Sequence, residues 1–274
     1  MQAPNSWSPP SGTLGAIVEQ TTHRVAALRA MRRELESGLA GAPSVAPFAA
    51  ALRGPMVRVI AEVKRRSPSK GTINAAMDAP AQAAAYEMGG AAVVSVLTES
   101  THFGGSNDDL LAVRVRVKLP VLKKDFHVDA IQLTEARVLG ASAALLIARA
   151  IDPAALPDLV AHANAIRLET LVEIRSQAEL ANALAAGARV IGVNCRDLEN
   201  LAMDASVAER LIAEIPADVI GVWESAISSM ADVQRAASFG ADAVLVGSAV
   251  SAAEDPSAAV RALSAVPRVE GIRD

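Results

Sequence analysis

Residues 59–71 read VIAEVKRRSPSKG, an apolar run typical of a buried strand that ends in charges and a loop. Because side chains two apart in a strand share a face, Glu62 and Lys64 project together, on the side where Ile60 points. Burying an unpaired charge is costly, so a fold keeps such a pair mainly where chemistry needs it. The loop that follows, rich in Ser, Lys and Gly, suits a phosphate or a flexible cover.

Composition narrows the function classes. The chain has 274 residues, enough for one large domain, with 51% hydrophobic and only 3% aromatic residues, which favours close-packed helices on a sheet. The net charge of −4 comes from well-mixed charges and argues against a nucleic-acid or membrane partner. A single cysteine, Cys195, excludes a disulfide framework and a multi-cysteine metal cluster. With no secretory signal and no long apolar run, we expect a cytoplasmic protein.

Beyond residue 55, short apolar runs alternate with helical segments. The runs lie at 57–63, 91–97, 120–123, 142–147, 169–174, 189–193, 219–222 and 241–246. The helical segments between them lie at 79–88, 108–117, 128–139, 151–166, 176–186, 206–215 and 230–239. Runs that are apolar on both faces indicate parallel strands joined by right-handed crossovers. The pattern predicts an α/β fold, a (β/α)8 TIM barrel, rather than an open sheet, and no Gly-x-Gly-x-x-Gly follows the first strand.

The segment before the barrel contains one predicted helix. Apolar residues recur at helical spacing from Leu14 to about Leu39, which predicts an amphipathic helix. Residues 1–12 are rich in Pro and Ser and predict a tail without regular structure. We therefore divide the chain into residues 1–55, a tail, helix and connector packed on the barrel, and residues 56–274, the barrel itself.

Polar residues gather where six of the predicted strands end. In TIM barrels the active site lies at the C-terminal ends of the strands. A single strand-end Glu or Lys is usually a solvated cap or a structural ion pair. No single ion pair explains a whole ring of them, so the sequence predicts a catalytic site. The residues are Glu62, Lys64, Lys123, Lys124, Glu173, Asn194, Arg196, Glu224, Ser225, Gly247 and Ser248.

The motifs around these residues resemble those of the indole-3-glycerol phosphate synthase family. The matching stretches are 60–71, 97–99 with 103–106, 120–126, 192–198 and 246–248. The resemblance runs from the leading helix to the last one. It implies a carboxy-lyase of tryptophan biosynthesis that needs no cofactor and no metal. Its reaction would close the ring of 1-(2-carboxyphenylamino)-1-deoxyribulose 5-phosphate, with loss of carbon dioxide and water, to give indole-3-glycerol phosphate.

The resemblance also implies catalytic roles. Lys124 matches the general acid that protonates the ketone, and Glu173 matches the acid/base carboxylate of the later dehydration. Lys64 is a second cation near the substrate carboxylate, and Glu62 orients it. Because a lysine acid works best with a lowered pKa, we expect two lysines in one cavity to lower the pKa of each other.

Further residues match substrate-binding positions of the family. Asn194, Glu224 and Ser225 match contacts to the substrate hydroxyls, and Arg196 matches a residue near an anionic end. Phe103 and Phe126 are candidate walls for the anthranilate ring, with ordinary core packing as the alternative. For the phosphate, the candidates are Ser67 in the loop and, after the last strand, Gly247 and Ser248.

Three positions depart from the family pattern. Ala226 stands where the family usually has glycine, Trp223 precedes Glu224, and Arg175 replaces a residue that is often histidine. If φ at Ala226 is negative, alanine costs little. If it is positive, about 1 kcal/mol of strain and looser phosphate binding follow.

Two alternatives stay open. A sister barrel, phosphoribosylanthranilate isomerase, needs a Cys and Asp acid/base pair, and Glu62 and Lys64 on the first strand count against it. A non-catalytic or altered-specificity paralogue that binds sugar phosphates is supported only by Ala226 and Trp223. Other enzymes of the tryptophan pathway are possible partners. Cys195 is interpreted as a small barrel residue, and no histidine has metal-ligand spacing.

Overall fold

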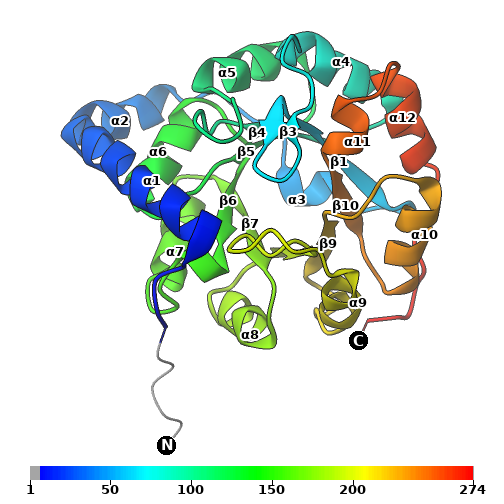
Figure 1. The fold of residues 1–274 in the computed structure, drawn as a ribbon. Helices are drawn as coiled ribbons and strands as arrows, with labels where there is room; N and C mark the ends of the chain where they lie inside the picture. The colour runs from blue at the N-terminus through cyan, green and yellow to red at the C-terminus, as the bar shows by residue number, and fades with distance from the viewer. Residues whose placement is uncertain (1–6, 274) are drawn as a thin grey trace, which may run out of the picture.

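A closed barrel of eight parallel strands forms the centre of the protein. The computed structural model describes residues 7–273, so residues 1–6 of the predicted tail lie outside the described residues. The strands pair in the order β1-β10-β9-β8-β7-β6-β5-β4, which confirms the TIM barrel (Figure 1). They are β1 (Arg58–Val63), β4 (Val93–Leu97), β5 (Val121–Lys124), β6 (Ala143–Ile147), β7 (Glu169–Ile174), β8 (Val190–Asn194), β9 (Ile220–Glu224) and β10 (Ala243–Val246).

An outer ring of helices covers these strands. It consists of α4 (Ala79–Gly89), α5 (Asn107–Arg116), α6 (Ala130–Val138), α7 (Leu156–Ala165), α8 (Gln177–Ala185), α9 (Ala205–Ala213), α10 (Met230–Ser238) and α12 (Pro256–Leu263). Each except α7 begins after an Asp or Ser whose side chain accepts a hydrogen bond from the first turn. Helix α7 starts later than predicted because Asp152 first closes a turn, after the 3-10 helix η2 (Ala148–Ala150).

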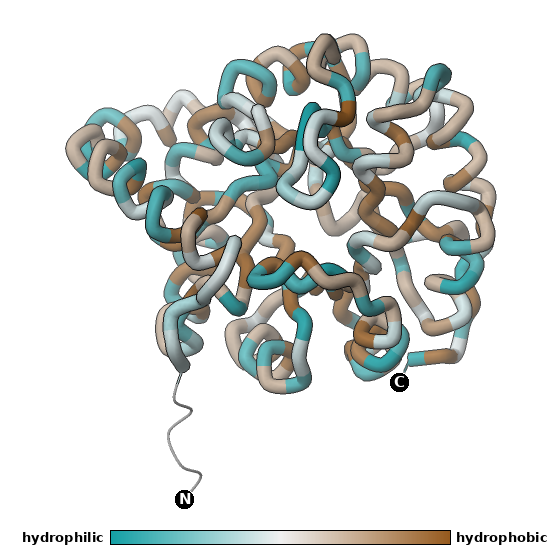
Figure 2. Tube along the Cα trace, in the orientation of Figure 1, coloured by the Kyte–Doolittle hydropathy of each residue, from teal (hydrophilic) through white to brown (hydrophobic). Residues whose placement is uncertain are grey.

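Side chains alternate between two cores along each strand. Ile60, Leu122 and Leu171 point into the barrel, whereas Val59 and Val172 pack outward under the helices. In Figure 2 the hydrophobic segments follow the ring of strands, and hydrophilic residues are frequent on the outer helices and loops. The short helix α3 (Phe48–Ala51) adds Phe48 to the inner core, and the inner core therefore extends to the segment that precedes β1.

Much of the N-terminal segment packs against the outer helix α6. It forms two helices, α1 (Gly12–Ala30) and α2 (Arg32–Gly38), followed by the 3-10 helix η1 (Leu39–Gly41). Both α1 and α2 lie beside α6 (Figure 1). The prediction of a helix before the barrel is confirmed, but one unbroken helix to Leu39 is wrong. The break at Met31 lets Leu35 pack with Val25 and Ile131, a contact that periodicity alone does not reveal.

Besides η2 after β6, two further loops at the carboxyl ends of the strands contain short regular elements. After β1, the strands β2 (Arg66–Ser67) and β3 (Gly71–Thr72) form a small antiparallel hairpin. The short helix α11 (Ser248–Ser251) follows β10. Within residues 7–273, no helix is long and apolar enough to cross a membrane. The division of the chain at residue 55 stays a prediction.

Candidate active site

A cavity of about 440 Å³ lies at the carboxyl ends of the barrel strands. The walls come from the barrel, the β2–β3 hairpin and the first turns of α1. With the exception of Lys123, every predicted site residue lines this cavity: Glu62, Lys64, Ser67, Phe103, Lys124, Phe126, Glu173, Asn194, Arg196, Glu224, Ser225, Gly247 and Ser248. The two lysines of the strand-end motif on β5 separate, because Lys123 points away from the barrel axis and pairs with Asp125 and Glu135.

Lys124 lies at the centre of the charged groups. The Nζ atom of Lys124 is 3.1 Å from Oε2 of Glu173 and 3.2 Å from Oε2 of Glu224. Burial alone would lower the pKa of Lys124, but Glu224, Glu173 and Glu62 outweigh it and raise the pKa well above its ordinary value. The expectation of a lowered pKa is therefore wrong for Lys124 in the free protein, because carboxylates from three strands face its ammonium group.

Glu62 and Lys64 form the second ion pair of the cavity. Oε1 of Glu62 is 2.8 Å from Nζ of Lys64, so the two side chains project together as the strand spacing predicts. Burial would raise the pKa of Glu62, but the charges of Lys64 and Lys124 outweigh it and lower the pKa. A Cβ on Gly247 would lie 2.4 Å from Oε1 of Glu62 and 2.5 Å from Nζ of Lys64. A side chain at position 247 would therefore displace the ends of this pair.

A chain of hydrogen bonds connects Glu173 to the strand-end residues of β8 and β9. Nδ2 of Asn194 donates to Oε1 of Glu173 at 3.0 Å, and Oγ of Ser225 donates to Oδ1 of Asn194 at 2.8 Å. The backbone N–H of Arg196 donates to the same amide oxygen at 2.9 Å. Both oxygens of Glu173 therefore have a fixed partner, Asn194 on one side and Lys124 on the other.

Glu224 is a buried carboxylate of the cavity whose pKa is raised. Burial raises the pKa of Glu224 to about 8, with Lys124 opposing the rise and Glu173 adding to it. A Cβ on Gly192 of β8 would lie 2.0 Å from Oε1 of Glu224, so this glycine makes room for the carboxylate. Gly192 was not predicted as a site residue, although it stands in the quoted motif before Asn194.

The neutral form of Glu224 has a consequence for pH dependence. Below pH 8 Glu224 is protonated, Lys124 has one counter-charge fewer, and its proton leaves more easily than above pH 8. We expect kcat/KM of the wild-type protein to fall as pH rises through about 8, the value to which the pKa of Glu224 is raised. The variant Glu224→Gln, which stays neutral, should not show this fall in kcat/KM, whereas the surface variant Glu209→Gln should show it. If kcat/KM of Glu224→Gln still fell near pH 8, Glu224 would not be the group that causes the fall.

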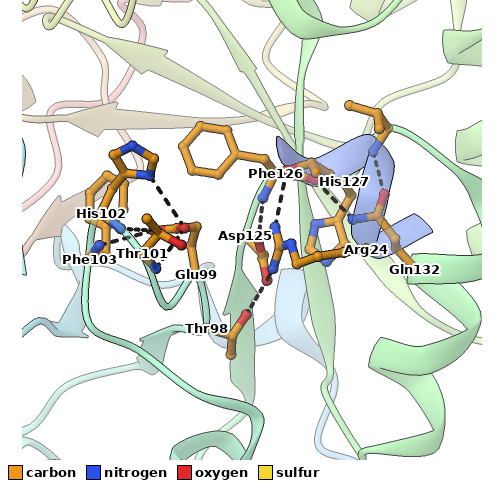
Figure 3. A network of polar contacts seen from close by, with 12 residues as sticks. Arg24, Thr98, Glu99, Thr101, His102, Phe103, Asp125, Phe126, His127 and Gln132 are labelled. Carbon is orange, nitrogen blue, oxygen red and sulfur yellow. Dashed lines mark hydrogen bonds and ion pairs between the residues drawn. The ribbon is translucent and has the colours of Figure 1, made fainter. Parts of the chain in front are cut away.

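The apolar wall of the cavity is an aromatic pair. The ring centroids of Phe103 and Phe126 lie 6.0 Å apart at an angle of 39°. Beside them lie two buried carboxylates, Glu99 and Asp125, and each accepts hydrogen bonds from several donors (Figure 3). Glu99 accepts hydrogen bonds from the backbone N–H groups of Thr101, His102 and Phe103, so the turn that carries Phe103 is fixed.

The structure answers the open question about Ala226. Ala226 has φ +55° and follows Ser225 at φ +67°, so both lie in the left-handed region that favours glycine. The backbone strain that we expected at Ala226 for a positive φ is therefore present. Arg167, in the turn between α7 and β7 and outside the cavity lining, has a similar φ of +58°.

Replacing Ala226 by glycine should remove this strain. We expect Ala226→Gly to increase the free energy of unfolding by about 1 kcal/mol, a rise of about 2–4 °C in Tm. If phosphate binds here, the closer backbone should also lower KM for a phosphorylated substrate. Arg167→Gly is the matched control, because it should raise Tm without changing KM. A fall in Tm of Ala226→Gly would show that φ at this position causes no strain.

Residues of α1 also belong to the site, and the sequence did not identify them. Leu14 and Ile17 line the cavity. Their helical periodicity was visible, but not which face of the helix meets the barrel mouth. Arg175 lies 3.5 Å from Asp197, beside a smaller cavity of about 200 Å³ that shares Glu173.

Cys195 and His127, two further candidates for reactive or metal-binding side chains, are buried in the core. Burial raises the pKa of Cys195 to about 12, so its thiol is a neutral core group. Nδ1 of His127 lies 2.7 Å from the carbonyl oxygen of Leu145. Within residues 7–273, no three His, Cys, Asp or Glu side chains are grouped to hold a metal ion.

A closed barrel with a charged cavity at the carboxyl ends of its strands defines a (β/α)8-barrel enzyme. The family model described as indole-3-glycerol phosphate synthase matches residues 14–263. The chain belongs to the indole-3-glycerol phosphate synthase family. This membership confirms the family resemblance and the enzyme class predicted from the sequence, a carboxy-lyase of tryptophan biosynthesis. It excludes the isomerase alternative.

Named relatives agree along most of their length. An indole-3-glycerol phosphate synthase of Streptomyces griseus is 50% identical over 232 residues, 85% of this chain and 86% of the relative. One of Mycobacterium leprae is 44% identical over 253 residues, 92% of this chain and 93% of the relative. Among solved structures, 3-hexulose-6-phosphate synthase from Salmonella typhimurium has a TM-score of 0.62 at 16% identity, covering 76% of this chain and 97% of that one. This last likeness shows the fold alone.

Proposed function

We propose that this chain converts 1-(2-carboxyphenylamino)-1-deoxyribulose 5-phosphate into indole-3-glycerol phosphate, with Lys124 as general acid and Glu173 as acid/base carboxylate. The observation that carries the proposal is the position of the Lys124 ammonium between Glu173 and Glu224, inside a cavity with an aromatic wall. A proton donor and a carboxylate in hydrogen-bond contact are what a ring closure followed by a dehydration requires.

Substrate binding is assigned to the walls around this centre. Gly247, Ser248 and Ser67 would bind the phosphate, and the anthranilate ring would lie against Phe103 and Phe126. The substrate carboxylate would face Lys64 and Arg196, which line the same cavity. Asn194, Glu224 and Ser225 would contact the hydroxyls. Together these contacts would bring the aromatic carbon that bears the carboxylate close to the ketone carbon.

In the first step, this aromatic carbon attacks the ketone carbon, and the ketone oxygen takes the proton of Lys124. The alkoxide that develops is a stronger base than an amine, so a lysine with a raised pKa still protonates it. The carboxylate then leaves as carbon dioxide, and its bonding electron pair restores the aromatic ring. Glu62 keeps Lys64 oriented at the carboxylate while this occurs.

In the second step, the new hydroxyl leaves as water and a neighbouring carbon loses a proton, which completes the indole. We assign the removal of the carbon-bound proton and its transfer to the leaving hydroxyl to Glu173, because Asn194 and Lys124 hold the two oxygens of Glu173 in place. The proton that the carbon loses leaves with the hydroxyl as water, so Lys124, deprotonated by the first step, regains its proton from solvent when the products leave.

The altered-specificity paralogue makes a different prediction for binding and turnover. Titration calorimetry with a reduced, non-cyclising substrate analogue, set beside a turnover assay, separates a binder from a catalyst. Binding together with turnover supports the proposal. Binding of the analogue without turnover of the substrate would favour the paralogue.

Two further expectations follow from the proposed reaction. A biosynthetic enzyme that consumes a phosphorylated intermediate is expected in the cytoplasm. Association with other tryptophan-pathway enzymes stays a prediction, which co-purification from cells would test.

A further inference from the structure

Asp125 lies between two proposed site residues, Lys124 and Phe126, and its side chain is only 2% exposed. The carboxylate accepts hydrogen bonds from α1, from the loop after β4 and from the loop after β5 (Figure 3). Oδ1 accepts hydrogen bonds from Nη2 of Arg24 at 2.8 Å and from the backbone N–H of Phe126 at 2.8 Å. Oδ2 accepts one from Oγ1 of Thr98 at 2.6 Å and lies 3.3 Å from Nζ of Lys123.

The backbone on both sides of Asp125 is also held. The N–H of Thr98 donates to the carbonyl oxygen of Lys124 at 3.1 Å. Nε2 of Gln132 donates to the carbonyl oxygen of Phe126 at 3.0 Å, and its Oε1 accepts from the N–H of Val128 at 2.8 Å. The peptide groups of residues 124–126 are therefore fixed at both ends, by Gln132 of α6, by Thr98 in the loop after β4 and by the Asp125 carboxylate.

We propose that Asp125 is a positioning residue, which aims Lys124 and Phe126 into the cavity, and that Arg24 of α1 is the cation that keeps it in place. The effect of Asp125 on turnover rests on the proposed function. Asp125 acts by holding the backbone of residues 124–126 and the side chains that donate hydrogen bonds to it. Helix α1 then also helps to position β5, the strand that carries the general acid.

Arg24 is the partner that best tests this role. Lys123 is buried and shared with Glu135, so its loss would leave charges unpaired in the core. The Arg24 side chain is 39% exposed, and its removal should leave the barrel folded. A matched control lies one turn further along α1, where Arg29 pairs with Asp129 and its side chain is 60% exposed. Both pairs join α1 to the segment after β5, but only one contacts Asp125.

The experiment compares Arg24→Met, Thr98→Val and the control Arg29→Met, with kcat and KM expressed per folded molecule from circular dichroism. We expect kcat to fall by about tenfold to a hundredfold in the first two variants, because small misplacement of a catalytic group has effects of this size. Arg29→Met should stay within about twofold of wild type. Arg24→Lys, which keeps the charge, should recover most of the loss. Equal kcat in Arg24→Met and Arg29→Met would overturn the inference.

A second measurement does not depend on turnover. The chain has four phenylalanines, so fluorine-labelled phenylalanine gives a simple ¹⁹F NMR spectrum. In Arg24→Met, the signals of Phe103 and Phe126 should shift or broaden, and those of Phe48 and Phe239 should not. Arg29→Met should change none of them. If the wild-type protein fails to turn over, the proposed function fails, and unchanged ring signals in Arg24→Met would then overturn the positioning role on their own.

Discussion

Replacing Lys124 by alanine is expected to lower kcat by at least about a thousandfold, because a positioned general acid contributes about 10²–10⁴-fold and this lysine also offsets nearby carboxylates. The assay is the appearance of indole fluorescence under substrate saturation. The informative companion is Lys124→Arg. Arginine keeps a cation between Glu173 and Glu224 but holds its proton too tightly to act as an acid.

The two variants should differ in stability. Lys124 is only 13% exposed and pairs with two carboxylates, so its removal should affect folding as well as turnover. In Lys124→Ala, unpaired buried carboxylates should cost about 3–5 kcal/mol at neutral pH. The folded pKa of Glu224, which Lys124 no longer lowers, then lies above the unfolded value of about 4.3, so stability is regained as pH falls towards that value. Lys124→Arg should stay near wild type in Tm. Substantial turnover by Lys124→Arg would remove Lys124 from the acid role.

Glu173→Gln is expected to lower kcat by about 10²–10⁴-fold, the range for one acid/base group, and to stall the second half of the reaction. Glutamine has the same shape and can keep the hydrogen bond from Asn194, so ring closure and decarboxylation should proceed. In a single turnover followed by rapid quenching, carbon dioxide should appear before indole fluorescence, with a decarboxylated intermediate between them.

Glu169 provides the control for this variant. It lies on the same strand β7 at the opposite end of the barrel, where it accepts hydrogen bonds from the backbone of Phe48 and Ala49. Glu169→Gln should change Tm rather than the order of events. If Glu173→Gln released carbon dioxide and indole together at an equal, reduced rate, Glu173 would act before decarboxylation.

The sequence was sufficient for the barrel, because each strand is a short run that is apolar on both faces. The strand at 169–174 was predicted with the bounds that the structure has. The ring of site residues was predictable for a related reason. Parallel strands bring their carboxyl ends to one face, so Glu62, Lys124 and Glu173 meet there although they lie far apart in the chain.

What could not be predicted depends on contacts between distant elements. The raised pKa of Lys124 needs carboxylates from β1, β7 and β9 at defined distances. Arg24 of α1 and Thr98 in the loop after β4 are partners of Asp125, and no spacing in the sequence connects Arg24 to Asp125. The positive φ at Ala226 is set by the loop after β9, so the sequence alone could not decide between a negative and a positive φ.

The most direct test of the central claim is continuous indole fluorescence on mixing the purified protein with 1-(2-carboxyphenylamino)-1-deoxyribulose 5-phosphate, without added metal or cofactor. We predict a signal that rises from the first turnover and a rate that saturates with substrate. A flat trace from protein shown to be folded by circular dichroism would contradict the account.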